Sequence, residues 1–281
     1  MPRYPTAEAD VRQTQRWYFL LQSFIIVFWH IGCGSFAILA LTQPVFTKQA
    51  LPFHAWLPMD LHNPEKHPIA HALVYAWQVM SLSYNLCICV YVDLQSTFCY
   101  PEVAVNLKIL CIELNAFARE CQHDEQRFRR EFRRLAAFHQ RMMRNVTSIN
   151  DVYYWPMIGQ MVFVFVMISL TAFIALANKG DPNTYKFIVF MILSLAYLTF
   201  ICALGDMVTQ QSQEVAMAAY DIYEHAPNSK EVQLDIGFMM YRAQEPLQIG
   251  APPFPPFNLI SNMAVLKQCY AILTVLLETL D

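Results

Sequence analysis

Few side chains in the sequence have the type and spacing that metal or nucleophilic chemistry requires. Four histidines lie between His54 and His71, and Cys87 and Cys89 are one residue apart. Imidazole and thiolate are common zinc ligands, but neither spacing matches a known ligand pattern. The sequence also lacks a glycine-rich phosphate loop, an HExxH or CxxC motif, and any arrangement that indicates a nucleophile. We therefore predict no catalytic residue, no metal site and no cofactor. A channel, receptor or transporter is favoured over an enzyme.

Arginines form the other chemically distinctive group. They recur from Arg127 to Arg144, among apolar residues at helical spacing. We interpret them as the solvated face of a helix with some attraction to anionic lipid head groups, in preference to a specific ligand site. The net charge of −3 makes nucleic acid an unsuitable partner, because neutralising phosphates needs a basic surplus.

Charge-free stretches indicate the elements that must position these side chains. The chain is 56% hydrophobic and 15% charged, whereas soluble domains are about 25% charged. No Asp, Glu, Lys or Arg occurs in residues 17–47, 67–92, 152–178 or 187–205. A membrane span needs about 20 apolar residues in a helix, and a soluble bundle rarely buries so many helices of this length. The sequence therefore predicts an all-α membrane protein with five transmembrane helices, over residues 17–41, 69–92, 155–178, 187–208 and 259–280.

Lysine and arginine are distributed unequally among the connections. Fourteen fall in residues 1–16, in the loop between the second and third spans and in the segment before the last span, and four fall on the other side. The basic side of a membrane protein is normally cytoplasmic. We therefore expect a cytoplasmic N-terminus and an extracellular C-terminus.

The basic side is predicted to contain folded helices. Helices that continue the second and third spans are indicated by apolar stripes from Leu107 to Ala118 and from Phe128 to His139. A further helix before the last span has an apolar stripe from Val232 to Met240, whose partner is either this chain or another subunit. The expected segments are 1–16 (cytoplasmic), 17–98 (two spans and an external loop), 99–151 (cytoplasmic helices), 152–210 (two spans), 211–257 (cytoplasmic helices) and 258–281 (the last span).

Capping residues and prolines set the ends of the last two helices. Asn228 followed by Glu231 predicts the start of the cytoplasmic helix, which must end before Pro246. Four prolines between Pro252 and Pro256 predict a stiff break, and Asn258 is placed to cap the last span.

The final third of the sequence resembles the insect odorant receptor family, whose members are seven-span ligand-gated cation channels of the plasma membrane. The stretches that carry the resemblance are Ala218–His225 (AAYDIYEH), Met239–Ile249, the proline-rich Pro252–Asn258 and the closing Leu266–Leu277. The external Leu51–Asp60 also looks like the family's second external loop.

The sequence departs from the family pattern in two ways. Tyr223 stands near a position that is usually Trp in the family. The five predicted spans look like the family's third to seventh, so that on the order of a hundred residues of the family have no counterpart at the start. This is expected of a truncated gene model or of a short form.

The resemblance implies that the last span lines the pore of a hetero-tetramer built with a common co-receptor. The family's gate lies at the third and seventh positions after the tyrosine of the closing motif, which here are Leu273 and Leu277. Lys267 lies at the border of the implied stripe, where a cation would repel permeant cations. A pore lined by leucines can close by dewetting. The implied pore stripe consists of Asn262, Leu266, Tyr270, Leu273, Thr274 and Leu277.

The resemblance also implies a ligand pocket in the outer half of the membrane. Apolar and aromatic walls with a few hydroxyls suit a small, volatile, mostly apolar ligand. The implied pocket residues are Phe28, Gly32, Ser35, Tyr75, Val79, Met80, Ser83, Phe190, Met191 and Ser194.

These expectations describe a tuning subunit that binds odorants within the lipid membrane and gates a non-selective cation channel with a co-receptor. A non-conducting accessory or truncated isoform is one alternative. A solute transporter is another, for which spans broken by Gly or Pro in symmetric halves are expected.

Overall fold

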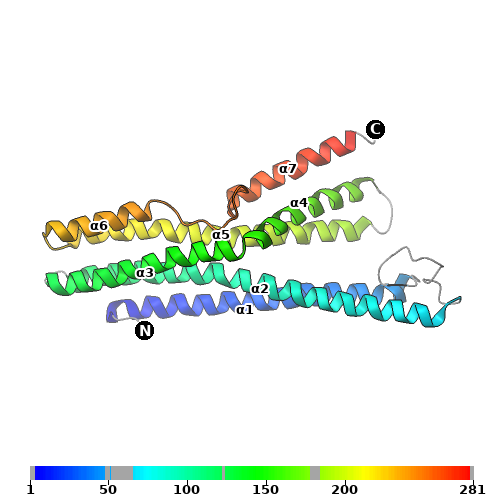
Figure 1. Cartoon of the computed structure of the whole chain (residues 1–281), viewed down its shortest axis with the longest axis horizontal. Coiled ribbons are helices and arrows are strands. Elements are labelled where there is room, and N and C mark those ends of the chain that lie inside the picture. The colour runs from blue at the N-terminus through cyan, green and yellow to red at the C-terminus, as the bar shows by residue number, and fades with distance from the viewer. Residues whose placement is uncertain (1–3, 48–50, 52–65, 122–123, 178–183, 279–281) are drawn as a thin grey trace. The chain divides into compact units, whose positions relative to one another are not determined.

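The computed structural model describes residues 4–47, 51, 66–121, 124–177 and 184–278, which form helices and their connections without a strand (Figure 1). Most of Leu51–Asp60, and the side chains of Phe190 and Leu277, lie outside the described residues. The elements are η1 (Pro5–Ala7), α1 (Glu8–Thr47), α2 (Pro68–Glu120), α3 (Glu125–Val152), α4 (Tyr154–Ala177), α5 (Thr184–His225), α6 (Lys230–Ala243) and α7 (Leu259–Glu278).

The all-α membrane fold predicted from the sequence is confirmed. α1, α2, α4 and α5 are long and apolar enough to cross a membrane, and α7 contains a shorter apolar stretch, Leu259–Val275. α4 and α7 begin where the third and fifth spans were predicted to begin. α1, α2 and α5 extend well past their predicted spans, because their sequences stay helix-compatible where they become polar.

The chain divides into two compact units. Unit 1 comprises Met1–Tyr18 and Cys99–Asp281, and unit 2 comprises Phe19–Phe98. Unit 2 includes the apolar parts of α1 and α2. Many of the large apolar side chains described there are exposed, including Phe19, Phe24 and Trp77. Such a surface is costly in water and is typical of helices that face lipid.

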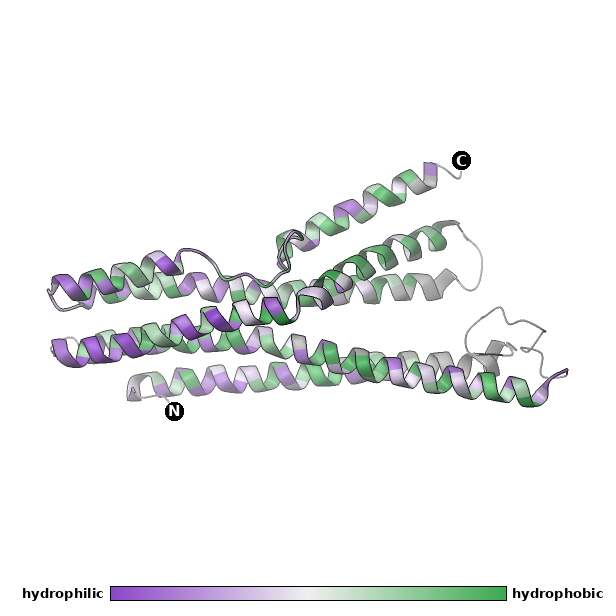
Figure 2. Cartoon of the chain, in the orientation of Figure 1, coloured by the Kyte–Doolittle hydropathy of each residue, from purple (hydrophilic) through white to green (hydrophobic). Residues whose placement is uncertain are grey.

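The apolar half of unit 1 consists of α4, α7 and the first part of α5, which pack against one another. Met157, Val164 and Ile168 of α4 are buried, as are Val265 and Cys269 of α7. Figure 2 shows α4 as an almost continuously hydrophobic helix, whereas α3 is largely hydrophilic.

The polar half of unit 1 consists of the chain start, α3, α6 and the adjacent parts of α2 and α5 (residues 99–120 and 205–225). Both predicted stripes are buried here, and the rings of Phe117 and Phe128 lie 4.5 Å apart between centroids. The α6 stripe is buried too, at Val232, Ile236 and Met239, and α6 packs on α5. Its partner is therefore this chain's own helix.

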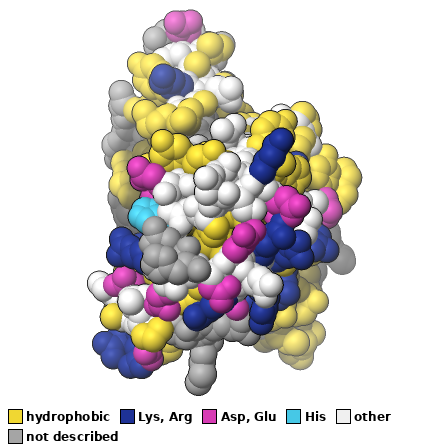
Figure 3. All heavy atoms as spheres, turned by 90° about the vertical axis from the view of Figure 1, so that its left-hand side faces the viewer, with side chains coloured by type: hydrophobic (Ala, Val, Ile, Leu, Met, Phe, Trp, Pro, Cys, Tyr) yellow, Lys and Arg dark blue, Asp and Glu magenta, His cyan; other side chains and the backbone are white. Residues whose placement is uncertain are grey.

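Charged side chains surround this core. Arg134 bonds Glu113 of α2 at 3.1 Å and Glu131 at 3.0 Å, and the Tyr4 hydroxyl donates to Glu131 at 3.2 Å. Arg129 forms an ion pair with Glu231 of α6. Figure 3, which views the chain from this end, shows side chains of both signs interspersed. The arginine face is therefore solvated and tied together by ion pairs.

The helix starts predicted around α6 and α7 differ in outcome. The prediction for α6 is wrong by one residue, because Ser229 occupies the N-cap and makes no side-chain cap bond. The prediction for α7 is confirmed, because the Asn258 carboxamide accepts the Ser261 N–H at 2.7 Å. α6 ends at Ala243, before Pro246, as predicted.

Candidate functional site

α7 is held against the rest of unit 1 along one face of its first half. Ser261, Asn262, Val265 and Cys269 are buried, and these positions follow one another at helical spacing. None of the described side chains of α7 beyond Cys269 is buried. The helix is therefore packed at its start and largely uncovered over the rest of the described chain.

The predicted pore stripe lies beside this buried face. Its first member, Asn262, is 4% exposed and donates to the Thr199 hydroxyl of α5 at 3.0 Å. Leu266, Leu273 and Thr274 are half-buried, whereas Tyr270 is 69% exposed. Lys267 is exposed. Apart from Asn262, the described stripe residues are thus available to another molecule.

The linker between α6 and α7 is bonded to α3 and α4 by side chains. The Asn150 carboxamide donates to the Gln248 carbonyl at 2.9 Å and accepts the Gly250 N–H at 3.2 Å. The Tyr154 hydroxyl donates to the Pro252 carbonyl at 2.8 Å. These bonds satisfy linker backbone groups that no helix or strand satisfies.

A second set of contacts bonds the linker to α5. The Leu247 N–H donates to the Ser212 hydroxyl at 2.9 Å, and the Leu247 carbonyl accepts from Thr209 at 3.1 Å. At Gly205 the linker comes so close that an added Cβ would lie 2.1 Å from the Phe257 carbonyl oxygen. Only glycine allows this approach.

The predicted ligand-pocket residues are divided between the two units. Those of α1 and α2 belong to unit 2, where Gly32, Met80 and Ser83 are exposed and Tyr75 and Val79 are half-buried. Those of α5 belong to unit 1, where Met191 and Ser194 are half-buried and the side chain of Phe190 is outside the described residues. Phe28 and Ser35, in unit 2, are exposed.

Two of the predicted hydroxyls already have a donor role within their own helices. Ser35 donates to the Gly32 carbonyl and Ser83 to the Val79 carbonyl, each at 2.9 Å. What these side chains offer a ligand is therefore an oxygen lone pair, which suits a ligand that carries a hydrogen-bond donor.

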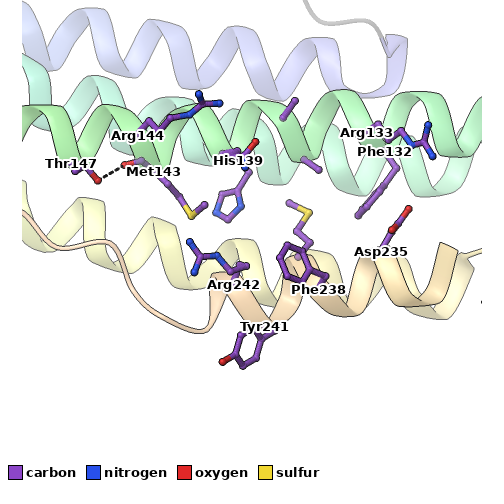
Figure 4. Close-up of a pocket in the computed structure, with 14 residues that line it drawn as sticks. Phe132, Arg133, His139, Met143, Arg144, Thr147, Asp235, Phe238, Tyr241 and Arg242 are labelled. Carbon is purple, nitrogen blue, oxygen red and sulfur yellow. Dashed lines mark hydrogen bonds between the residues drawn. The ribbon is translucent and has the colours of Figure 1, made fainter. Parts of the chain in front are cut away.

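A groove of about 1070 Å³ lies between α3 and α6 in the polar half (Figure 4). His139 and Met143 of α3 point toward α6, Arg242 of α6 points back toward α3, and Tyr241 points away (Figure 4). Burial lowers the pKa of His139, and the charge of Arg242 lowers the pKa further. The groove therefore combines aromatic, thioether and guanidinium groups beside a buried histidine whose pKa lies below its usual value.

Comparison with known proteins identifies the family. A family model described as "7tm Odorant receptor" matches residues 3–270. The chain belongs to the odorant receptor family. It is 35% identical to Odorant receptor 65a of Drosophila melanogaster over 98% of its own length and 66% of the relative's. It is 32% identical to Odorant receptor 47b of the same species, over 97% of its own length and 66% of the relative's.

The fold is also that of a solved receptor. The olfactory receptor OR5 from Machilis hrabei in complex with eugenol matches with a TM-score of 0.77 and 16% identity, over 95% of this chain and 70% of that one. The chain thus spans about two thirds of the length of these odorant receptors. The family resemblance and the multi-pass membrane class predicted from the sequence are confirmed, and the family is not one of enzymes.

The sequence analysis missed the linker contacts and the groove. One signal was available for the linker, since a proline-rich connection leaves backbone carbonyls that need partners. Asn150, Thr209 and Ser212 are polar residues of predominantly helical segments, but their pairing with Gln248, Gly250 and Leu247 depends on tertiary structure.

Proposed function

We propose that the chain is a tuning subunit of an odorant receptor, which binds a volatile ligand in the membrane and gates a non-selective cation channel with a co-receptor. The observation that carries this proposal is the family match over residues 3–270. Ligand binding acts by favouring the open arrangement of α7 through its differential affinity for that arrangement.

The uncovered part of α7 supports its role as the pore helix. A helix that only packed on its own bundle would have one buried face and would otherwise be exposed to lipid. α7 instead has the half-buried Leu266, Leu273 and Thr274 beside its buried face. In a tetramer such a flank can face the axis, and Leu273 and Leu277 form the constriction that closes by dewetting.

Polar substitution of the constriction tests this function. Leu273→Ser and Leu277→Ser should ease hydration of the closed pore and raise the resting current of cells that co-express a co-receptor. Ile272→Ser is the matched control, because Ile272 lies on another side of α7. Unchanged leak, ion selectivity and odour response in both leucine variants, at normal surface expression, would show that these residues are not the gate.

The ligand class follows from the proposed pocket residues. The oxygens of Ser35 and Ser83 can accept a hydrogen bond, and aromatic residues such as Phe28 and Tyr75 supply apolar walls. We expect a small apolar volatile with one hydroxyl group, for which eugenol, the ligand of the structural relative, is a first probe. An odour panel in which hydroxyl-free analogues act equally well would argue against the serine contacts.

The orientation belongs to the same proposal. The excess of lysine and arginine in the polar half supports a cytoplasmic location for it, with the N-terminus inside and the end of α7 outside. An epitope tag after Asp281 should stain intact cells. Staining only after permeabilisation would reverse the orientation.

The exposed face of α6 supports assembly with the co-receptor. Leu234, Phe238 and Tyr241 lie on one side of this helix and are exposed, next to the arginines of the groove. Aromatic residues and arginine are enriched in protein interfaces. Phe238→Asp should reduce co-purification with the co-receptor, whereas a variant that still co-purifies fully would place the interface elsewhere.

A further inference from the structure

The linker contacts have a consequence for the movement of α7. Residues 244–258 connect α6, which is packed in the polar half, to α7, which is uncovered beyond Cys269. A connection of this length would ordinarily let the two helices move separately. Here Ile249, Ala251 and Phe257 are buried. Side chains of α3, α4 and α5 bond the linker carbonyls of Leu247, Gln248 and Pro252.

Asn150 has the central place among these contacts. Its carboxamide uses both its donor and its acceptor on the linker, at Gln248 and Gly250, which lie about 100 positions away in the sequence. The neighbouring Ile249 carbonyl accepts the Phe257 N–H at 2.8 Å and so closes the linker on itself. Fixing the backbone at Gly250 therefore also fixes Phe257, the residue before the cap of α7.

Asn262 fixes the first turn of α7 in a similar way. Its amide donates to Thr199 of α5, and among the described residues its Oδ1 has no hydrogen-bond partner. Asn262 is 4% exposed, so leaving this oxygen unpaired costs free energy that the bond to Thr199 offsets only in part. Its bond ties the first turn of α7 to α5, immediately after the Asn258 cap.

We propose that Asn150 is a positioning residue for the pore helix: with Asn262, it holds the inner end of α7 to α3 and α5, so that movement during gating is confined to the part beyond Cys269. This inference rests on the proposed function for its gating consequence, but the positioning itself is a property of the chain alone.

Hydrogen–deuterium exchange on the purified full chain in detergent tests the positioning without any ligand or current. In Asn150→Ala, exchange of the Gly250 amide should become about tenfold faster, since one to two hydrogen bonds are lost. Amides of Ser261 and Asn262 should also exchange faster, while the Phe117 region of α2 should be unchanged. Asn145→Ala is the matched control, because Asn145 is an exposed asparagine of the same helix.

Asn150→Asp distinguishes the contribution of the bond to Gln248 from that of the bond to Gly250, and as a nearly isosteric change it is less disruptive to folding than Asn150→Ala. An aspartate keeps an acceptor for the Gly250 N–H but loses the donor to Gln248, so exchange at Gly250 should be intermediate. Unchanged exchange at Gly250 in both variants would overturn the proposal. Faster exchange at Gly250 without any change at Ser261 and Asn262 would also overturn it, because the linker would then fix only itself.

Current measurement tests the gating consequence. With a co-receptor, Asn150→Ala should raise the ligand-free current severalfold at equal surface expression, and Asn145→Ala should not. If the unmodified chain carries no current with any co-receptor, the proposed function fails while the exchange result still decides the positioning. If exchange changes as expected but the current does not, the inner end of α7 is positioned without an influence on the gate.

Discussion

α2 passes through two environments along a single helix. From Pro68 to Phe98 many of its large apolar side chains are exposed, and Trp77 is 68% exposed. From Cys99 to Glu120 the arrangement is reversed, and Phe117 is fully buried while Lys108 and Glu120 are exposed. The helix has the same backbone in both parts, so the difference comes from the solvent: hydrocarbon accepts apolar side chains that water would drive into a core.

The comparison shows how differently the two parts gain stability. The second part buries apolar area away from water, which is the main driving force of soluble folds. The first part has no hydrophobic driving force for helix association, because lipid is as apolar as the side chains, so its association depends on close packing and hydrogen bonds. We therefore expect truncation of a large apolar side chain to destabilise the second part most, and introduction of a charge to be the damaging change in the first part.

The largest effect is expected in the water-facing core. Phe117→Ala removes a fully buried ring that packs against Tyr4 and Phe128, and should cost about 3–5 kcal/mol of unfolding free energy. Thermal unfolding of the purified chain measures this loss. Trp77→Ala, a larger truncation in the lipid-facing part, should change the unfolding temperature much less. Equal effects of the two substitutions would contradict the proposed difference between the water-facing and lipid-facing parts of α2.

A charge in the lipid-facing part comes next. Trp77→Arg should disfavour membrane insertion by about 2–3 kcal/mol, because an arginine near the middle of a span must reach the interface or be desolvated. Glycosylation mapping of the inserted fraction measures it, with Trp77→Leu as the control. Full insertion of the arginine variant would mean that this face of α2 lies in water or against protein.

The smallest effect is a pH dependence in the polar half. Burial keeps the pKa of His139 below its usual value, so the unfolded chain binds a proton there that the folded chain does not. This contribution to stability is complete above a pH of about 6.5 and is lost as pH falls from there toward the pKa in the folded chain. His139→Gln should therefore flatten the decline of the unfolding temperature below that pH.

The controls for this prediction come from the same helix. Replacing an exposed arginine of α3, such as Arg130→Gln, should leave the shape of the pH profile as it is. If His139→Gln leaves the acid decline unaltered, other groups dominate the acid sensitivity of the polar half.

Much of this fold could be predicted because two of its features can be recognised from the order of residues alone. Charge-free runs located the spans, and the stripes from Leu107 and Phe128 located the buried faces of α2 and α3. The start of α6 was misplaced by one residue, since Asn228 and Ser229 are both favourable caps and only the backbone decides between them. The pore and ligand residues came from the resemblance and stay predictions.

The linker contacts could not be predicted from the sequence, because they join residues that are far apart in it. Nothing near Asn150 in the sequence indicates Gln248 or Gly250, and the need for glycine at Gly205 arises only because Phe257 of a distant segment lies against it. Tertiary proximity of this kind is fixed by the packing of several helices at once.

The prolines of the linker have a mechanical consequence. Pro252, Pro253, Pro255 and Pro256 cannot donate the hydrogen bonds that a helix requires, so α6 and α7 cannot merge into one continuous rod. A tensile load on α6 therefore cannot travel to α7 as helix stretch or twist. It passes along the linker backbone, which side chains of α3, α4 and α5 hold in place through Asn150, Tyr154, Thr209 and Ser212, so the stiffness of this joint can be changed by substituting these side chains one at a time.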